Sequence, residues 1–595
     1  MAKLSRILAL PLVVLLTSAG SGSEAVKALA AGEPMILRVW NWEDYIGVVE
    51  VDGEEIPLDE YFEQYVKEVD GVDIDVIYET FDTNETMLSQ LQSGAATYDL
   101  ICPSDYAIQK MMSQGLLQPF ALGEEERKVL YGDTYGNWSD NYDLYASPYL
   151  KNWFDNISAS VPGDDGTSST HTLSEYARGY MWGTLGITYN PEYKGYIQAG
   201  MRPEDVMVQM SDWNALWDQT AFWGTFQIKD SMRDTFSIGL MRSFDRAFEF
   251  LLKLYREGKI AQEKYTDAVN IIFNCINHVD SFNALMAELN TYLDSSETPF
   301  ETDYTIESII SVTQSDLEVL RGNSYGLETD SGKTDIQTGT RSGICLAWSG
   351  DAIYSMDTAE EETGIELYYS VPSTGGNIWF DGWVIPKNAE NVEYANKFID
   401  FLSDPEIAAL NMDYIGYTPF IAGDDIVEKA KEWYDEKTWA IEEDPTLAET
   451  VLDWDAYAEE EGWLRVDLSY FFEGSLSEGE DAIFYTTEIQ PVTGKNLKGE
   501  DETVYVGRQF LAQYPTIGLP DNLDIIPGLA VMEDYGNNNE YVLRMWENVK
   551  ASGVLEPWII VLFCLEIVLA IGIASYFIVR KQLSLRERKK RRAAK

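Results

Sequence analysis

Histidine and cysteine are scarce in this chain of 595 residues, and the shortage of histidine excludes classes of chemistry. The two histidines are His171, in a polar Ser/Thr-rich stretch, and His278, after an apolar run. Histidine-rich metal sites are therefore excluded, and few candidates remain for Ser-His or Cys-His catalysis. The glycine-rich fingerprints of nucleotide-binding loops are missing as well, so we expect neither a cofactor nor a metal.

Basic residues are also few. The chain has 43 Lys and Arg residues against 100 Asp and Glu residues, a formal net charge of −57. A body so acidic repels nucleic acid and anionic lipid and favours cationic ligands, so we expect no nucleic-acid partner. Hydrophobic residues make up 45% of the chain and aromatic residues 13%, which indicates a globular protein long enough for several domains.

The two ends of the chain predict export and anchoring. Basic residues, a short apolar stretch and small residues within 1–31 are typical of a secretory signal peptide. Residues 557–579 form an almost purely apolar run and predict one C-terminal transmembrane helix. The basic residues in 580–595 predict a cytoplasmic tail, which places the acidic body at the extracellular face of the cell membrane on a single-pass anchor.

The region after the signal alternates strand and helix patterns. Residues 36–40, 72–78 and 98–102 are typical of strands, whereas 58–69 and 83–91 have the spacing and start signals of amphipathic helices. Repeated β-α-β units predict an α/β fold with a mostly parallel sheet, whose ligands bind beyond the carboxyl ends of the strands.

Tryptophan, tyrosine and acidic residues are concentrated just after two of these strands, in residues 41–45 and 103–106. An ammonium group between aromatic faces gains about 0.5–2 kcal/mol of cation–π attraction. A carboxylate at each end adds charge-assisted hydrogen bonds, and aromatic rings between them cover methylene groups. The pattern therefore predicts a slot for a linear aliphatic cation with two or three amines.

Five segments resemble, in order and spacing, the bacterial spermidine/putrescine-binding proteins of ABC importers: residues 39–45, 98–106, 346–352, 378–386 and 415–419. The resemblance implies a two-lobed periplasmic-binding-protein fold of type II, with lobes joined by hinge crossings. It divides the chain into lobe 1, at residues 36–186 and 380–418, and lobe 2, at residues 187–379 and 419–550, with an acidic insertion at 424–530.

The resemblance also implies a set of ligand-binding residues. Aromatic side chains would form the walls and carboxylates would meet the amines. The set is Trp42, Glu43, Asp44, Tyr45, Ser104, Asp105, Tyr106, Asp234, Trp348, Asp351, Trp379, Asp381 and Tyr417. We expect Arg233 to pair with Asp234 and orient it, and Trp213 and Trp217, at helical spacing, to lie in the core.

Two positions depart from the family pattern. Ser231 stands where spermidine-preferring relatives carry a second carboxylate, and Glu43 replaces a small hydroxyl residue. Both changes alter the charge of the expected site, so the preference between putrescine and spermidine stays open.

The predicted function is that of the extracellular polyamine-binding component of an ABC importer. It is not an enzyme, and it delivers putrescine or spermidine to a separate permease and, through it, to ATPase subunits. One alternative is a receptor for another small solute such as a sugar, although neutral solutes need amide and hydroxyl groups rather than several inward carboxylates. A second is a surface glycosidase, which requires two carboxylates about 5–10 Å apart beside an open cleft.

Overall fold

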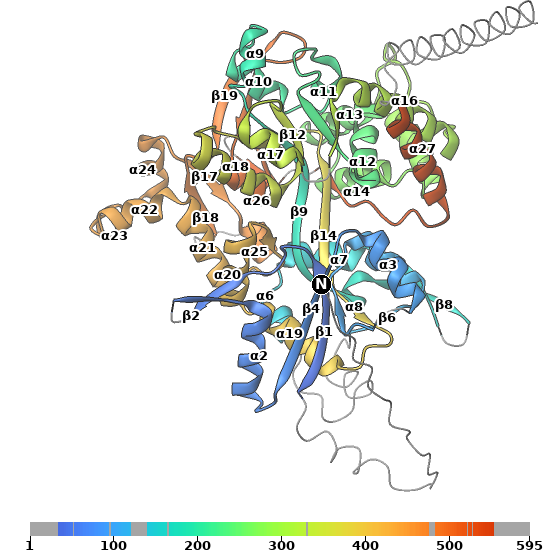
Figure 1. Cartoon of the computed structure of the whole chain (residues 1–595). Coiled ribbons are helices and arrows are strands. Elements are labelled where there is room, and N and C mark those ends of the chain that lie inside the picture. Colours follow the sequence, from blue (N-terminus) through green and yellow to red (C-terminus); the bar gives the residue numbers. More distant parts are fainter. Residues whose placement is uncertain are drawn as a thin grey trace, which may run out of the picture.

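The computed structural model describes residues 34–552 except 52, 95–96, 121–139, 164–165, 329–330, 475–481, 520–521 and 526–527. Figure 1 shows two lobes, one below and one above, joined by two long strands that run between them, β9 (Arg178–Tyr189) and β14 (Gly376–Trp383). These strands pair antiparallel along most of their length, and all twelve residues of β9 are buried. The crossing is therefore a stiff, well-packed connection.

The first lobe, below in Figure 1, is built on a parallel three-stranded sheet in the order β4-β1-β5. The strands are β1 (Met35–Trp42), β4 (Ile74–Phe81) and β5 (Leu100–Ile101), and helices α2 (Leu58–Val69), α3 (Asn84–Ser93) and α4 (Asp105–Ser113) follow them. Leu58, Phe62 and Val66 recur every fourth residue on α2 and are fully buried. This confirms the β-α-β pattern expected from the sequence.

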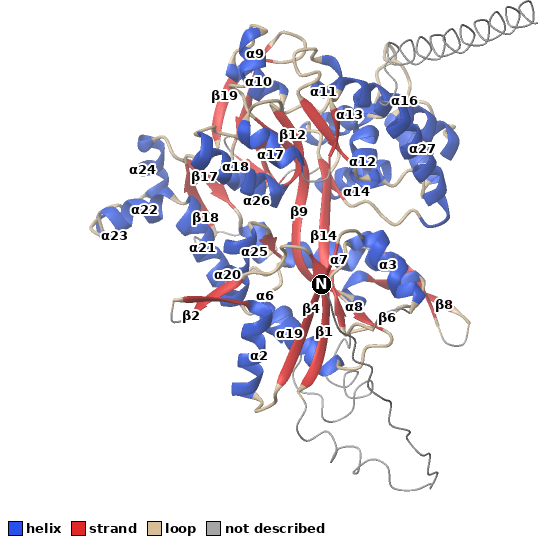
Figure 2. Ribbon diagram, viewed as in Figure 1, coloured by secondary structure: helices blue, strands red, loops and turns tan. Residues whose placement is uncertain are grey.

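Further elements complete the first lobe, and Figure 2 shows helices packed around its strands. The helices are α6 (Asp140–Tyr145), α7 (Pro148–Asn156), α8 (Leu173–Tyr176), α19 (Val392–Leu402) and α20 (Pro405–Ile415). The strand pairs are β2 (Val48–Val51) with β3 (Glu54–Pro57), β7 (Ser158–Pro162) with β8 (Ser168–Thr172), and β6 (Leu117–Gln118) with β15 (Ile385–Pro386).

The second lobe contains most of an eight-stranded sheet in the order β11-β10-β12-β9-β14-β23, with β13 and β16 also paired to β9. The further strands are β10 (Phe226–Lys229), β11 (Gly326–Glu328), β12 (Ile344–Trp348), β13 (Tyr368–Ser370), β16 (Thr418–Pro419) and β23 (Leu529–Ala530). Strand β10 runs parallel to both β11 and β12. The carboxyl ends of these three strands therefore meet at one edge of the sheet.

Helices surround this sheet (Figure 2). They are α9 (Lys194–Gln198), α10 (Pro203–Gln209), α11 (Ala215–Asp218), α12 (Met232–Ser243), α13 (Asp245–Arg256), α14 (Gln262–Phe273), α15 (Val279–Leu289), α16 (Ile306–Asn323), α17 (Ser331–Thr338), α18 (Ser349–Thr363) and α27 (Asn539–Ser552); a short 3₁₀ turn, Gly536–Asn538, precedes α27. Trp213 and Trp217 lie in the core of this lobe, as expected from their spacing.

The segment expected as an acidic insertion folds beside both lobes, drawn in orange in Figure 1. Its helices are α21 (Asp424–Tyr434), α22 (Glu436–Glu443), α23 (Leu447–Thr450), α24 (Trp454–Glu461), α25 (Ser469–Glu473) and α26 (Gln509–Gln513). Its strand pairs are β17 (Leu464–Asp467) with β18 (Ile483–Thr486), β19 (Gln490–Lys495) with β20 (Asp501–Val506), and β21 (Thr516–Leu519) with β22 (Asn522–Ile525).

Hydrogen bonds tie this segment to each lobe. In the first lobe, the Ser147 hydroxyl donates to the carbonyl of Phe471 at 2.5 Å. In the second, the Gln209 amide donates to the carbonyl of Lys495 at 3.0 Å. The segment therefore spans the outside of the junction between the lobes.

The expected membrane helix requires a correction. Within the described part of the chain, no helix is both long and apolar enough to cross a bilayer. The described residues thus support the two-lobed α/β fold, but they give no support to the C-terminal transmembrane helix that the apolar run 557–579 predicted. That run, the signal peptide at 1–31 and the basic tail at 580–595 lie outside the described residues.

Candidate ligand-binding site

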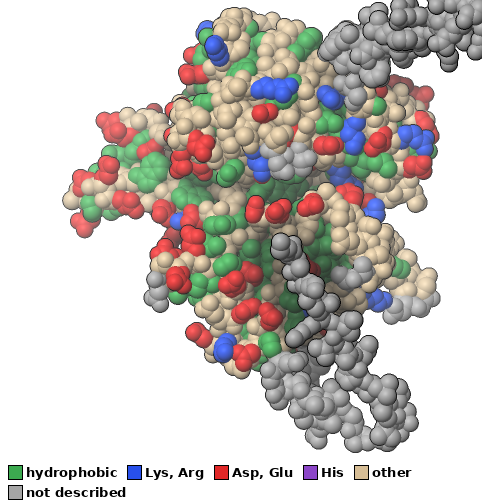
Figure 3. Space-filling view, in the orientation of Figure 1, with side chains coloured by type: hydrophobic (Ala, Val, Ile, Leu, Met, Phe, Trp, Pro, Cys, Tyr) green, Lys and Arg blue, Asp and Glu red, His purple; other side chains and the backbone are tan. Residues whose placement is uncertain are grey.

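The surface is hollowed between the two lobes, with hydrophobic side chains deep inside and acidic side chains along the rim (Figure 3). Asp381, on the crossing strand β14, is 6% exposed. The Tyr45 hydroxyl donates a hydrogen bond to its Oδ2 atom at 3.0 Å, whereas Oδ1 has no hydrogen-bond partner among the described residues. Burial raises the pKa of Asp381 to about 6, although the nearby hydroxyl groups of Ser104 and Tyr45 oppose the shift.

Aromatic rings join Asp381 to a second carboxylate. The Tyr417 ring contacts Tyr45 and Trp379 edge-to-face, with centroids 5.4 and 5.5 Å apart. The Tyr417 hydroxyl donates to Oδ1 of Asp351 at 3.3 Å, and Asp351 lies in the first turn of α18. Four chain segments that are distant in the sequence thus place two carboxylates at the ends of an aromatic cluster.

Trp348 lies at the carboxyl end of β12, beside Asp351. Its ring is covered by a residue that the sequence analysis missed: Lys229, whose Nζ atom is 4.3 Å from the ring centroid. The same ammonium is 3.7 Å from Oδ2 of Asp351, and Lys333 approaches Oδ1 of Asp351 at 3.2 Å. The sequence gives one sign that Lys229 has a role in the site: it is a basic residue at the end of a run that is typical of a buried strand.

Asp234 lies in the first turn of α12 and is 7% exposed. Burial raises the pKa of its carboxyl group, against the opposing effects of Ser231, Lys229 and the Trp348 indole. The structure therefore groups Asp234 with Trp348 and Asp351 on the side of the second lobe.

Three further candidate residues lie at the end of β1 and just after it. Glu43 and Asp44 are exposed and form no ion pair or hydrogen bond with described residues. Asp44 has a φ of +52°, in the left-handed region that Asp tolerates better than most residues. Trp42 is partly buried against Phe81, with ring centroids 4.6 Å apart.

Asp105 is held by the backbone. Its Oδ2 atom accepts a hydrogen bond from the N–H of Phe380 at 3.0 Å, and Oδ1 accepts one from the N–H of Tyr106 at 2.5 Å. Burial raises the pKa of Asp105 to about 7. The carboxyl group thus fastens the start of α4 to the crossing strand β14.

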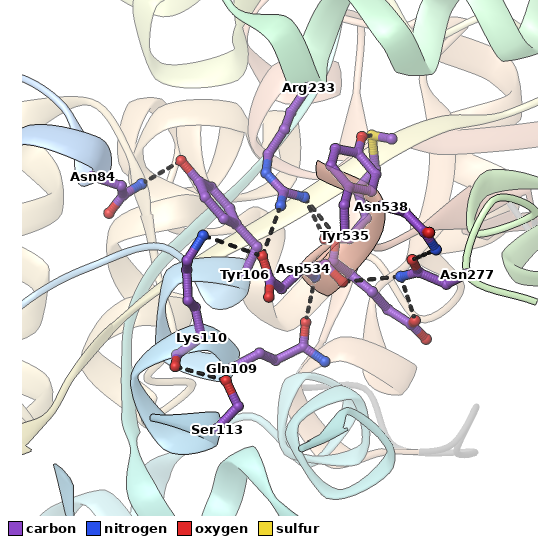
Figure 4. A network of polar contacts seen from close by, with 12 residues as sticks. Asn84, Tyr106, Gln109, Lys110, Ser113, Arg233, Asn277, Asp534, Tyr535 and Asn538 are labelled. Atoms are coloured by element: carbon purple, nitrogen blue, oxygen red, sulfur yellow. Dashed lines mark hydrogen bonds and ion pairs between the residues drawn. The ribbon is translucent and has the colours of Figure 1, made fainter. Parts of the chain in front are cut away.

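Tyr106 belongs to a polar network that joins the lobes (Figure 4). The Arg233 guanidinium of α12 lies between the rings of Tyr106 and Tyr535, 3.7 and 4.3 Å from their centroids. It also pairs with Asp534 at 3.7 Å, and the backbone N–H of Asp534 donates to Oε1 of Gln109 at 2.9 Å. The expectation that Arg233 pairs with Asp234 was therefore wrong, because the nearby Asp534 takes that role.

Since Tyr106 and Gln109 lie on α4 of the first lobe, this network closes one side of the junction. Lys110, also on α4, adds a long ion pair of 3.9 Å to Asp534. The loop before α27 that carries Asp534 has no family motif, so the sequence offered no signal for it.

Comparisons with known proteins identify the fold's relatives. The chain is 25% identical over 406 residues to the putrescine-binding periplasmic protein of Pseudomonas aeruginosa, covering 67% of this chain and 81% of that one. It is 24% identical over 413 residues to the spermidine/putrescine-binding periplasmic protein of Escherichia coli, covering 68% and 84%.

Among solved structures, a putative spermidine/putrescine ABC transporter from Listeria monocytogenes is 26% identical, covers 66% of this chain and 85% of that one, and superposes with a TM-score of 0.40. The model of the family "Bacterial extracellular solute-binding protein" matches residues 60–438. This range includes the crossing strands and most of the candidate site residues. Because this match spans more than half of the chain, the protein belongs to the family of bacterial extracellular solute-binding proteins.

Proposed function

We propose that this protein binds a linear polyamine, putrescine or spermidine, in the cleft between its lobes, as the solute-binding component of an ABC importer. It works outside the cytoplasm and delivers the ligand to a separate permease, and through it to ATPase subunits. Its role is binding and release, without chemical conversion of the ligand. The domain boundaries and ligand-binding residues expected from the sequence form part of this proposal.

The observation that carries the proposal is the environment of Asp381. Its carboxylate is buried, has one oxygen without a hydrogen-bond partner among the described residues, and lies in the same cluster as the rings of Trp379 and Tyr417. An ammonium would satisfy that oxygen and gain cation–π attraction from the rings. A neutral sugar would leave the carboxylate's charge uncompensated, which is costly in a buried site.

The names of the relatives support the same ligand class, because both proteins cited above are putrescine or spermidine/putrescine binders. Each of these matches covers about two thirds of this chain, 67% and 68% respectively.

Isothermal titration calorimetry on the purified full chain, with putrescine, spermidine and a neutral disaccharide, tests the proposal. We expect at least one polyamine to bind with a micromolar or lower Kd and the sugar to give no heat of binding. If the sugar binds and neither polyamine does, the proposal is wrong.

A further inference from the structure

Lys229 and Glu328 occupy matched positions at the edge of the second lobe's sheet. They are the last residues of the parallel strands β10 and β11 and are register partners. Strand β12, on the other side of β10, ends at Trp348. The three side chains thus meet where the carboxyl ends of parallel strands converge, the usual location of ligand sites in such sheets.

The ammonium group of Lys229 is surrounded by the kinds of groups that we expect around an amine of the bound ligand. Its side chain is 2% exposed, and its ammonium lies 4.3 Å from the centre of the Trp348 ring. The ammonium is 3.1 Å from a carboxylate oxygen of Glu328 and 3.7 Å from one of Asp351. An aromatic face and two carboxylates around an ammonium are the same groups that the proposed function assigns to a ligand amine.

The charge of Lys229 is permanent at neutral pH. Burial opposes it, but the carboxylates of Asp351 and Glu328 outweigh burial and raise the pKa above the ordinary value of a lysine. Asp351 also pairs with Lys333 at 3.2 Å. The protein's own lysines therefore compensate the charge of Asp351 before any ligand arrives.

Asp381 differs in this respect. Its neighbours Tyr45 and Ser104 supply only hydroxyl groups, and it forms no ion pair with any described residue. At the Asp381 end of the cleft, the carboxylate is therefore available to a ligand amine. At the Asp351 end, the carboxylate is already paired with lysine side chains of the protein.

On the basis of the proposed function, we propose that Lys229 is a specificity-determining residue. Its ammonium occupies one amine position of the cleft and so selects the diamine putrescine over the triamine spermidine. An extra ligand ammonium near Trp348 would face a like charge at close range in a partly buried site, where repulsion is strong. The shorter diamine binds at Asp381 without entering that position.

The test removes the lysine together with its partner. The variant Lys229→Met/Glu328→Gln leaves neither charge buried alone, which protects folding. Calorimetry with putrescine and spermidine gives the ratio of their Kd values, a quantity that does not change if part of a preparation is unfolded. We expect the wild-type protein to bind putrescine at least tenfold more tightly, and the paired variant to reduce this preference at least tenfold.

Two further variants separate specificity from bulk charge and from structure. Lys397→Met/Asp70→Asn removes a lysine–carboxylate pair of the first lobe, away from the cleft, and should leave the ratio within twofold of wild type. Lys229→Arg keeps the positive charge and should retain the preference for putrescine.

Each remaining outcome has a definite meaning. If the wild-type protein prefers spermidine, or if the paired variant binds both polyamines with an unchanged ratio, Lys229 does not set specificity, although the proposed function stands. If neither polyamine binds the wild-type protein, the proposed function fails and the role of Lys229 fails with it.

Discussion

At the scale of single residues, the cleft depends on buried carboxyl groups with different partners. Asp381 accepts a hydrogen bond from the Tyr45 hydroxyl, and its other oxygen has no hydrogen-bond partner among the described residues. The similarly buried Asp99 is held by backbone N–H groups of Arg38, Glu390 and Asn391. The first arrangement leaves room for a ligand's ammonium, and the second stabilises the fold.

Replacing these two residues should separate binding from stability. We expect Asp381→Asn to weaken polyamine affinity at least tenfold, or about 1.4 kcal/mol, because the carboxylate's charge is lost. Asp99→Asn should lower the free energy of unfolding by about 1–3 kcal/mol and change Kd less than twofold, since it lies outside the cleft. Calorimetry and urea denaturation measure the two effects. Unchanged affinity in Asp381→Asn would refute the assigned site.

The raised pKa of Asp381 predicts a pH dependence of binding. Since that pKa is about 6 in the free protein and an ammonium binds only the ionised carboxylate, binding below pH 6 must release a proton. Affinity should therefore be constant above about pH 7 and fall about tenfold per pH unit below 6. Calorimetry between pH 5 and 8 checks this, and the Asp381→Asn variant should lack the decline. A wild-type affinity that rises toward pH 5 would contradict the mechanism.

At the scale of elements, the crossing of β9 and β14 positions the aromatic cluster. Gly183 of β9 is the register partner of Trp379 on β14. A Cβ atom at Gly183 would lie 2.6 Å from the Trp379 ring and 2.4 Å from the Ser349 hydroxyl, closer than atoms can pack. The absent side chain thus lets the indole of Trp379 lie directly over Gly183.

The substitution Gly183→Ala should displace the Trp379 ring and weaken polyamine affinity about tenfold or more. Gly322, near the end of helix α16, is a matched control because a Cβ atom there meets nothing within 4 Å. Gly322→Ala should leave affinity unchanged and stabilise the protein by about 0.5–1 kcal/mol. Equal affinities of the two variants would show that Trp379 does not depend on this close approach.

The elements also show what the sequence could predict. Helix α2 was predictable over its full length because its buried residues follow one periodicity. Tyr45, Trp348 and Asp381 were predictable as candidate site residues because they lie in recognisable motifs. Lys229 and Asp534 could not be predicted as functional residues, because the residues that they contact are brought close only by tertiary packing. The motifs implied a ligand contact for Asp105, but they gave no sign that its carboxyl group accepts hydrogen bonds from two backbone N–H groups.

At the scale of the whole molecule, the lobes are joined by the crossing strands, by the segment beside them and by the network around Arg233. The guanidinium lies on the second lobe, whereas the Tyr106 ring under it belongs to the first. Because this contact requires both lobes to be close, it stabilises the closed arrangement and should slow the release of ligand.

We therefore expect Arg233→Met to raise the dissociation rate of a polyamine about tenfold with a smaller change in the association rate. Arg242→Met is the control, because Arg242 lies on the same helix and also contacts a carboxylate, that of Asp218, and an indole, that of Trp217. Both of these partners belong to the second lobe, so the contact does not join the lobes. Stopped-flow tryptophan fluorescence measures both rates. Similar dissociation rates in the two variants would exclude a closing role for Arg233.

The most direct measurement is a crystal structure of the full chain grown with putrescine. The account predicts one extended ligand between the lobes, with an ammonium nitrogen within about 3 Å of the Asp381 carboxylate and its methylene groups against Trp379 and Tyr417. A putrescine molecule bound elsewhere, with Asp381 still lacking a cationic partner, would contradict the central claim.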